Sequence, residues 1–120
     1  MSKRILVVDD SPIILAAARV ALVDAGFDVE TRLGVDELGE KGAHGFDLVL
    51  MDVQMPELYG DDVASVLRGQ RALTTPIYLF STLPEHELRE LALQANVEGY
   101  ICKDAGTEHL VAEVRRILGV

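Results

Sequence analysis

The chain has 120 residues, of which 49% are hydrophobic, so it is long and apolar enough for one domain with its own core. Its net charge of −9 argues against nucleic-acid binding, which needs clustered Lys and Arg. The single Cys102 cannot form an internal disulfide, and the longest apolar runs are too short for a signal peptide or a membrane span. We therefore expect one cytoplasmic domain over residues 1–120, without membrane insertion.

Five short apolar runs predict five strands. The first, Ile5–Val8, lacks polar alternation, which is typical of a parallel strand covered on both faces. The second alternates and is weaker, which favours an outer strand. The second predicted strand covers residues 27–31, and the last three cover residues 46–51, 76–80 and 98–102.

A helix is predicted after each strand. The first starts at a cap on Asp10 or Ser11, has Pro12 near its first turn and stops at Gly26. Its core stripe is predicted to be Ile14, Ala17, Ala18, Ala21, Leu22 and Ala25. The other predicted helices are a glycine-interrupted one over 34–42, one capped by Asp61 or Asp62, one with Thr82 and Glu85 at capping-box spacing that ends at Asn96, and a last one capped by Thr107.

Five strands alternating with five helices predict an α/β fold, a doubly wound parallel sheet with right-handed crossovers. In such sheets the functional site lies beyond the carboxyl ends of the strands. The residues predicted to meet there are Asp9, Asp10, Asp52, Ser81, Thr82 and Lys103.

Three carboxylates at one edge repel one another unless positive charge joins them. A hard divalent cation such as Mg²⁺, or Mn²⁺ in its place, is the natural partner for oxygen ligands. Lys103 is the cation that the strand order brings to the same edge, and alone it could form an ordinary salt bridge. A lysine, a metal ion and a hydroxyl around one carboxylate are typical of a phosphoryl site.

These residues carry a family resemblance. The matching pieces are Val8-Asp9-Asp10, residues 51–56 with Gly60, Phe80-Ser81, and residues 100–103, at matching spacings on the β/α pattern. Over essentially its full length, the chain resembles the receiver domain of two-component response regulators, and in particular single-domain receivers of the chemotaxis type. The resemblance implies a flavodoxin-like strand order of 2-1-3-4-5.

The resemblance implies a role for each matching position. Asp52 would accept a phosphoryl group from a phosphohistidine, Lys103 would bind a phosphoryl oxygen and Ser81 would donate a hydrogen bond to the phosphoryl group. Tyr100 would be the switch aromatic that turns inward when Ser81 moves, and the fourth helix, fifth strand and fifth helix would form the readout surface. For Mg²⁺, the implied ligands are Asp10 and Asp52 directly, the backbone carbonyl of Gln54, and Asp9 through a water molecule.

The implied partners are a histidine kinase or histidine phosphotransfer protein and a downstream protein target.

Each residue also has a plainer interpretation. Asp9 and Asp10 could only cap the first helix, Ser81 could cap a later one, and Tyr100 could be an ordinary half-buried aromatic of an edge strand. Cys102 is expected to be a buried strand residue.

Two departures from the family pattern stand out. Asp104 follows Lys103 where receiver domains usually have Pro, with a cis bond before it. Since a cis peptide without Pro costs about 2.5–4 kcal/mol, we expect a trans bond here, or a strained cis bond. The first helix also carries apolar residues outside its core stripe, which could form a docking patch for a helical partner. These residues are Ile13, Leu15, Ala16, Val20 and Val23.

Three functions remain open on the sequence. The first is a stand-alone receiver, since no effector domain follows the last helix, that catalyses only its own phosphorylation and dephosphorylation and is no turnover enzyme. The second is a phosphorylation-independent interaction module with the same fold. The third is a metal-dependent phosphohydrolase with an aspartate nucleophile, which usually needs a second acid two residues later, where this chain has Gln54.

Overall fold

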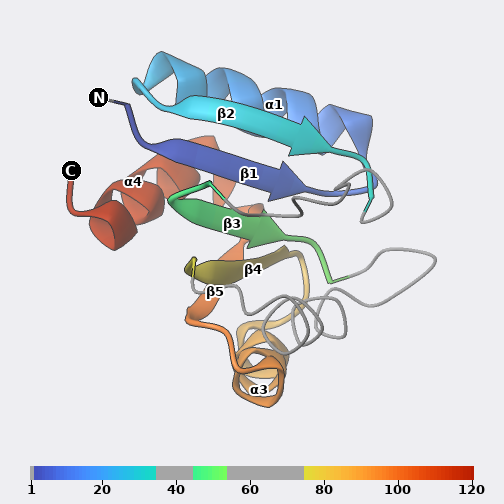
Figure 1. Cartoon of the computed structure of the whole chain (residues 1–120). Helices are drawn as coiled ribbons and strands as arrows, with labels where there is room; N and C mark the ends of the chain where they lie inside the picture. Colours follow the sequence, from blue (N-terminus) through green and yellow to red (C-terminus); the bar gives the residue numbers. More distant parts are fainter. Residues whose placement is uncertain (1, 35–44, 54–74) are drawn as a thin grey trace.

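The computed structural model describes residues 2–34, 45–53 and 75–120. Its centre is a parallel sheet of five strands in the order β2-β1-β3-β4-β5, which confirms the predicted fold class and strand order (Figure 1). The strands are β1 (Arg4–Val8), β2 (Asp28–Arg32), β3 (Leu48–Met51), β4 (Ile77–Ser81) and β5 (Gly99–Cys102). The central strands β1 and β3 consist almost wholly of buried residues, as continuous apolar runs in a parallel sheet should.

Helices cover both faces of the sheet (Figure 1). The helices of the described residues are α1 (Pro12–Asp24), α3 (Glu85–Ala95), α4 (Gly106–Leu118) and the short 3₁₀ turn η2 (Lys103–Ala105). α1 and α4 pack against one face and against each other, whereas α3 packs on the opposite face. The helices predicted over 34–42 and after Asp61 or Asp62 lie outside the described residues. Among the described helices, none is both long and apolar enough to cross a membrane.

The helix ends only partly follow the predicted caps. Ser11 caps α1, where its Oγ accepts a 3.3 Å hydrogen bond from the Ile14 N–H, and Asn96 ends α3 in the left-handed region with φ of 58°. The predicted capping box at Thr82 is wrong, because Pro84 holds the cap position of α3 and offers no side-chain acceptor. The cap at Thr107 is also wrong, because α4 already begins at Gly106.

The core stripe of α1 is shifted from the predicted one. Leu15, predicted on the outer face, is buried beside Ala18 and Leu22, while Ala17, predicted in the core, is exposed. The helix itself carries apolar residues around most of its circumference. The spacing of these residues alone therefore did not favour one buried stripe over another. An exposed apolar stripe remains without Leu15: Ile13 is 81% exposed and Val20 71% exposed.

Candidate functional site

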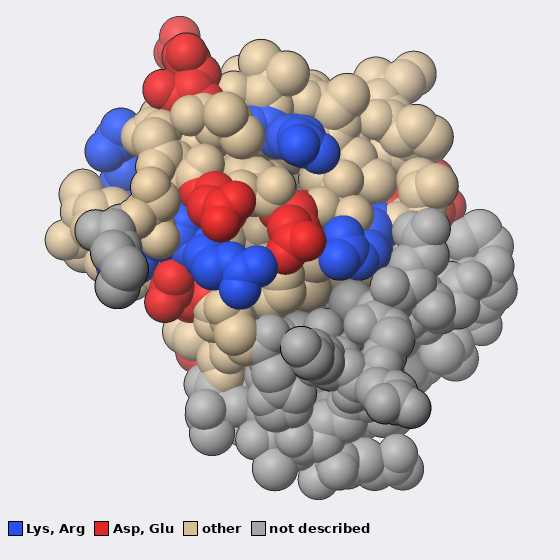
Figure 2. Space-filling model, turned by 45° about the horizontal axis from the view of Figure 1, so that its top comes forward, with Lys and Arg blue, Asp and Glu red and all other residues tan. Residues whose placement is uncertain are grey.

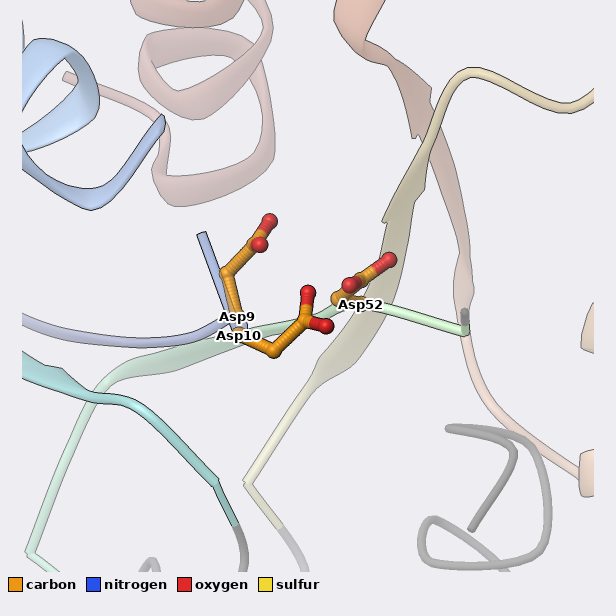
Figure 3. A group of neighbouring side chains, drawn as sticks. All are labelled: Asp9, Asp10 and Asp52. Atoms are coloured by element: carbon orange, nitrogen blue, oxygen red, sulfur yellow. The ribbon is translucent and has the colours of Figure 1, made fainter. Parts of the chain in front are cut away.

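Three carboxylates meet at the carboxyl ends of β1 and β3 (Figure 3). Asp9 and Asp10 directly follow β1, and Asp52 directly follows β3, which is paired with β1 so that Val8 lies beside Met51. One oxygen of each of the three carboxylates lies within 4.8 Å of the others. The predicted convergence of these acids is therefore a direct consequence of the register between the two central strands.

The surrounding backbone fixes two of these acids. The Asp52 N–H donates to the Val8 carbonyl at 2.9 Å, and the Asp9 N–H donates to the Arg32 carbonyl at 3.1 Å, so both ladders continue one residue past the strands. The Asp9 carboxylate also accepts a 2.9 Å hydrogen bond from the Ser11 N–H. Asp9 and Asp52 are buried, whereas Asp10 is exposed at the rim of the cluster. Of the three acids, Asp10 is therefore the one most exposed to solvent.

Lys103 brings a cation to the cluster from the end of β5. Its Nζ lies 2.5 Å from Asp9 Oδ2 and 3.4 Å from Asp52 Oδ1, and its side chain is only 10% exposed. The ammonium group also lies 5.3 Å from the centroid of the Phe80 ring, within the range of a cation–π contact. Lys103 is thus closer to Asp9 than to Asp52, a preference that the sequence did not predict.

Ser81 ends β4 and places a hydroxyl at the same edge. The side chain is fully buried, and its Oγ accepts a 3.1 Å hydrogen bond from the Leu83 N–H. This local turn holds the hydroxyl oxygen in place, and Ser81 is not the cap of α3, because that position belongs to Pro84. Gln54, also predicted as a site residue, lies outside the described residues.

Tyr100 is half-buried on β5, on the same side of the sheet as α3. Its hydroxyl donates a 2.7 Å hydrogen bond to the carboxylate of Glu85, and Arg89 contacts both groups, at 3.5 Å and 3.4 Å. Sequence reasoning missed this cluster. The i, i+4 spacing of Glu85 and Arg89 is a signal that could have suggested their ion pair, but only the packing of α3 beside β5 brings Tyr100 to them.

The peptide bond after Lys103 is not the cis bond that is usual at this position in the family. The described residues contain no cis peptide, so the bond between Lys103 and Asp104 is trans, as the energetic argument predicted. The chain continues as η2, and Asp104 is exposed. On the preceding residue, burial raises the pKa of the Cys102 thiol, and the charges of Glu85 and Asp104 raise it further. Cys102 lies on β5 as predicted, but it is half-buried and not buried, and its thiol is protonated at neutral pH.

The charges at this edge suit a divalent cation and a phosphoryl group. Three carboxylates face one ammonium group, so the cluster keeps an excess of negative charge that a hard cation with oxygen ligands would neutralise. A lysine beside a carboxylate and a serine hydroxyl at the same edge of the sheet can hold the oxygens of a phosphoryl group. The donor set of Asp9, Asp10 and Asp52 therefore fits Mg²⁺ or Mn²⁺.

A doubly wound sheet with an acidic cluster, a lysine and a serine at its carboxyl edge defines a class of α/β signalling domain. The chain belongs to the response regulator receiver domain family, whose sequence profile matches residues 5–115. Receiver domains are signalling modules of two-component systems that accept a phosphoryl group, and they are not turnover enzymes. They bind Mg²⁺ at an acidic pocket, and they interact with histidine kinases and downstream targets.

Individual relatives agree with this assignment. The transcriptional regulatory protein KdpE of Mycobacterium tuberculosis is 34% identical over 112 residues, which cover 92% of this chain and 49% of KdpE. The polar-differentiation response regulator DivK of Brucella ovis is 26% identical over 121 residues, which cover 99% of this chain and 98% of DivK. The chain thus spans about half the length of KdpE and nearly all of DivK.

Solved structures show the same fold. The chemotaxis protein CheY4 of Vibrio cholerae superposes with a TM-score of 0.87 and 29% identity, covering 98% of this chain and 100% of CheY4. The BeF₃-activated receiver domain of DrrB, a Thermotoga maritima protein, superposes with a TM-score of 0.84 and 27% identity over the full length of both chains. The chain therefore aligns along its length with receiver domains, including one in an activated form.

Proposed function

We propose that this chain is a response regulator receiver that accepts a phosphoryl group on Asp52 from a phosphohistidine of a histidine kinase or phosphotransfer protein. The observation that carries the proposal is the position of Lys103, whose ammonium group bridges Asp9 and Asp52 at 2.5 and 3.4 Å. An ammonium group at this place can move from its contact with the two carboxylates to a contact with a negatively charged phosphoryl oxygen. Ser81, fixed at the same edge by its bond to Leu83, supplies a hydroxyl for a second oxygen.

The transfer step balances without another reactant. A carboxylate oxygen of Asp52 attacks phosphorus, and the bond between phosphorus and the histidine nitrogen breaks. The electron pair of that bond stays on the ring, which leaves as neutral imidazole because its other nitrogen carries a proton. The product is an acyl phosphate on Asp52. Asp10, Asp52 and the Gln54 carbonyl would hold Mg²⁺, with Asp9 acting through water, and the ion would supply positive charge to the phosphoryl oxygens. Lys103 then exchanges part of its contact with Asp52 for a phosphoryl oxygen while Asp9 still holds it.

The hydroxyl of Ser81 and the ring of Tyr100 connect this chemistry to the surface. When the hydroxyl turns toward the phosphoryl group, space opens beside β4, and the Tyr100 ring can move into it after leaving Glu85. Glu85 lies in the first turn of α3, so the Tyr100 hydroxyl reports the chemistry at Asp52 to this helix. The output is a change in a protein-binding surface.

The direct test is labelling with a small phosphodonor in the presence of Mg²⁺. The wild-type chain should gain the mass of one phosphoryl group, and beryllofluoride should shift amide resonances from Asp52 to Tyr100. Asp52→Asn should abolish the label, whereas Asp24→Asn, which removes an exposed acid of α1 far from the cluster, should not. Unmodified wild-type protein would instead favour the phosphorylation-independent interaction module, and sustained multiple turnover would favour a phosphohydrolase.

The exposed stripe of α1 supports a helical phosphodonor. Ile13, Ala16, Val20 and Val23 are all exposed and recur at intervals of three, four and three residues, the spacing of a coiled-coil seam. Figure 2 views the side of the molecule with α1 and β2, where much of the surface is neither acidic nor basic. Because α1 begins at Pro12, two residues after Asp10, a helix packed along this seam would end beside the acidic cluster.

A double charge substitution tests this docking surface. The phosphodonor is a phosphorylated histidine-phosphotransfer domain that labels the wild-type chain. Val20→Lys with Val23→Lys should slow this transfer about tenfold or more, because two ammonium groups would enter an apolar contact. Labelling by a small phosphodonor should not change. Leu93→Lys is the matched control, because Leu93 is 77% exposed on α3. Equal transfer rates for the double variant and the wild-type chain would rule out this docking surface.

A further inference from the structure

The side chain of Lys103 reaches the acidic cluster across another strand. Lys103 directly follows β5, whereas Asp52 directly follows β3, and β4 lies between these two strands in the sheet. Neighbouring strands are about 4.8 Å apart, so roughly 10 Å of sheet separate the two positions of the chain. A residue of β4 therefore lies next to the path of the lysine side chain and can influence where its ammonium group rests.

Phe80 is the residue of β4 at this place. It pairs with Ile101 of β5, and the register between β3 and β4, continued by one residue, places Phe80 beside Asp52. The Nζ of Lys103 lies over the Phe80 ring, 5.3 Å from the ring centroid. Phe80 is only 5% exposed and belongs to the core on the side of α1 and α4. The ring is thus held by packing at a position that the lysine side chain has to pass.

The ammonium group of Lys103 has contacts of two kinds. Its contacts with Asp9 and Asp52 are ion pairs, and both carboxylates also belong to the donor set that fits Mg²⁺. A cation or a phosphoryl group at the site would therefore change both ion pairs. The contact with Phe80 is different, because a neutral ring attracts a cation through its quadrupole. This attraction stays the same when the charge of the cluster changes.

The ring also leaves the hydrogen-bond donors of Lys103 available. An ammonium group has three N–H donors on a flexible stem, and ordering that stem costs conformational entropy. A phenyl ring has no lone pair, so it attracts the charge from one side and takes no donor from an oxygen ligand. The donors can still point to Asp9, to Asp52 or to a phosphoryl oxygen.

We propose that Phe80 is a positioning residue for Lys103, because its ring keeps the ammonium group at the acidic cluster while the charge of the cluster changes. The inference deepens the proposed receiver function and rests on it for the step in which Lys103 binds a phosphoryl oxygen. The ring contact itself belongs to the unphosphorylated chain. A failure of this contact and a failure of phosphotransfer are therefore separate results.

NMR of the lysine side chains tests the contact without phosphotransfer. The chain has three lysines, and the signal that is absent from Lys103→Met assigns the one of interest. Protons above an aromatic ring are shifted upfield by its ring current. The ε-protons of Lys103 should therefore lie upfield of their position in the urea-unfolded chain, and they should keep this shift when Mg²⁺ is added. The same position in the folded and unfolded chains would overturn the proposal, as would loss of the upfield shift with Mg²⁺.

Fluorination of the ring separates its attraction for a cation from its packing. Phe80 is replaced site-specifically by 4-fluoro-, 3,5-difluoro- or 3,4,5-trifluorophenylalanine, which weakens the ring quadrupole stepwise with little change of shape. Labelling by a small phosphodonor with Mg²⁺ should slow with each step, by about twofold to fivefold for the trifluoro ring, which is the strength of a partly screened cation–π contact. The upfield shift of the Lys103 ε-protons should decrease in the same order.

Phe27 is the matched control, because its ring also lies near a cation. The Cζ of Arg115 is 5.8 Å from the Phe27 ring centroid, and Phe27 precedes β2 at the end of the sheet opposite the acidic cluster. The same fluorination there should leave labelling unchanged. Equal labelling across the Phe80 series would show that the ring only fills space and would overturn the proposal, as would equal slowing by the Phe27 series. An unlabelled wild-type chain would contradict the proposed function, and the ε-proton shift would still decide whether the ring holds Lys103.

Discussion

Replacing Lys103 by Met tests how strongly the acidic cluster depends on its own cation. The substitution keeps an unbranched apolar side chain that is one atom shorter, but removes the charge 2.5 Å from Asp9 and 3.4 Å from Asp52. Both acids are buried and would lose their positive neighbour. Removing one partner of a buried ion pair costs about 3–5 kcal/mol, and since Lys103 keeps slight exposure we expect the lower end, about 3 kcal/mol. The weak contact with the Phe80 ring is lost as well.

Urea unfolding measures this loss. With a slope of about 1.5 kcal/mol per molar urea, typical of small domains, the midpoint should fall by about 2 M. Added Mg²⁺ should raise the midpoint of Lys103→Met more than that of the wild-type chain, because a divalent cation replaces the missing charge between the same carboxylates. Asp9→Asn with Lys103→Met should lose less stability than the two single variants together, because the second change removes a charge that the first left unpaired.

Two outcomes would contradict this reasoning. A loss below about 1 kcal/mol would show that solvent screens the ion pair despite its burial. Additive losses in the double variant would show that Lys103 is held by packing and not by Asp9. Either result would also weaken the proposed transfer step, in which Asp9 keeps Lys103 near the phosphoryl group.

Two further predictions concern the packing of α1 and the chemistry of β5. Leu15→Ala should destabilise the fold by about 3 kcal/mol in urea unfolding, because it leaves a cavity in the core, whereas Ile13→Ala at the exposed stripe should cost less than about 0.5 kcal/mol. Iodoacetamide should alkylate Cys102 slowly at neutral pH and at the rate of free cysteine in urea, because burial, Glu85 and Asp104 raise the pKa of the thiol. The raised pKa also gives stability below an unfolded pKa of about 8.5 that is lost as pH rises through the folded pKa, and Cys102→Ala should lack this pH dependence.

The acidic cluster was predictable from sequence because parallel strands fix where their ends lie. Asp9, Asp10 and Asp52 each directly follow an apolar run, and in a doubly wound sheet the ends of neighbouring strands meet at one edge. Lys103 follows the last strand in the same way. No side-chain detail is needed for this prediction, only the number of strands and their order.

The contacts of those residues were not predictable in the same way. α1 carries apolar residues around most of its circumference, so the apolar spacing did not indicate whether Leu15 or Ala17 lies in the core. The spacing of Thr82 matched a capping box, but Pro84 fixes a turn that starts α3 two residues later. The contact of Tyr100 with Glu85 joins two elements whose distance depends on how α3 packs beside β5. These features follow from tertiary packing, which local patterns do not contain.

The central strands explain why the site can be both buried and accurately placed. Val8 pairs with Met51, and the hydrogen bond from the Asp52 N–H to the Val8 carbonyl extends this pairing to Asp52, the proposed phosphoacceptor. Asp9 is held in turn by the Arg32 carbonyl of the outer strand. A shift of either strand by one residue would reverse every side chain between the two faces and would bury charge in the core. The geometry of the acids is therefore set by the same apolar packing that stabilises the fold, whereas the exposed Asp10 and the charged end of Lys103 remain able to respond to a ligand.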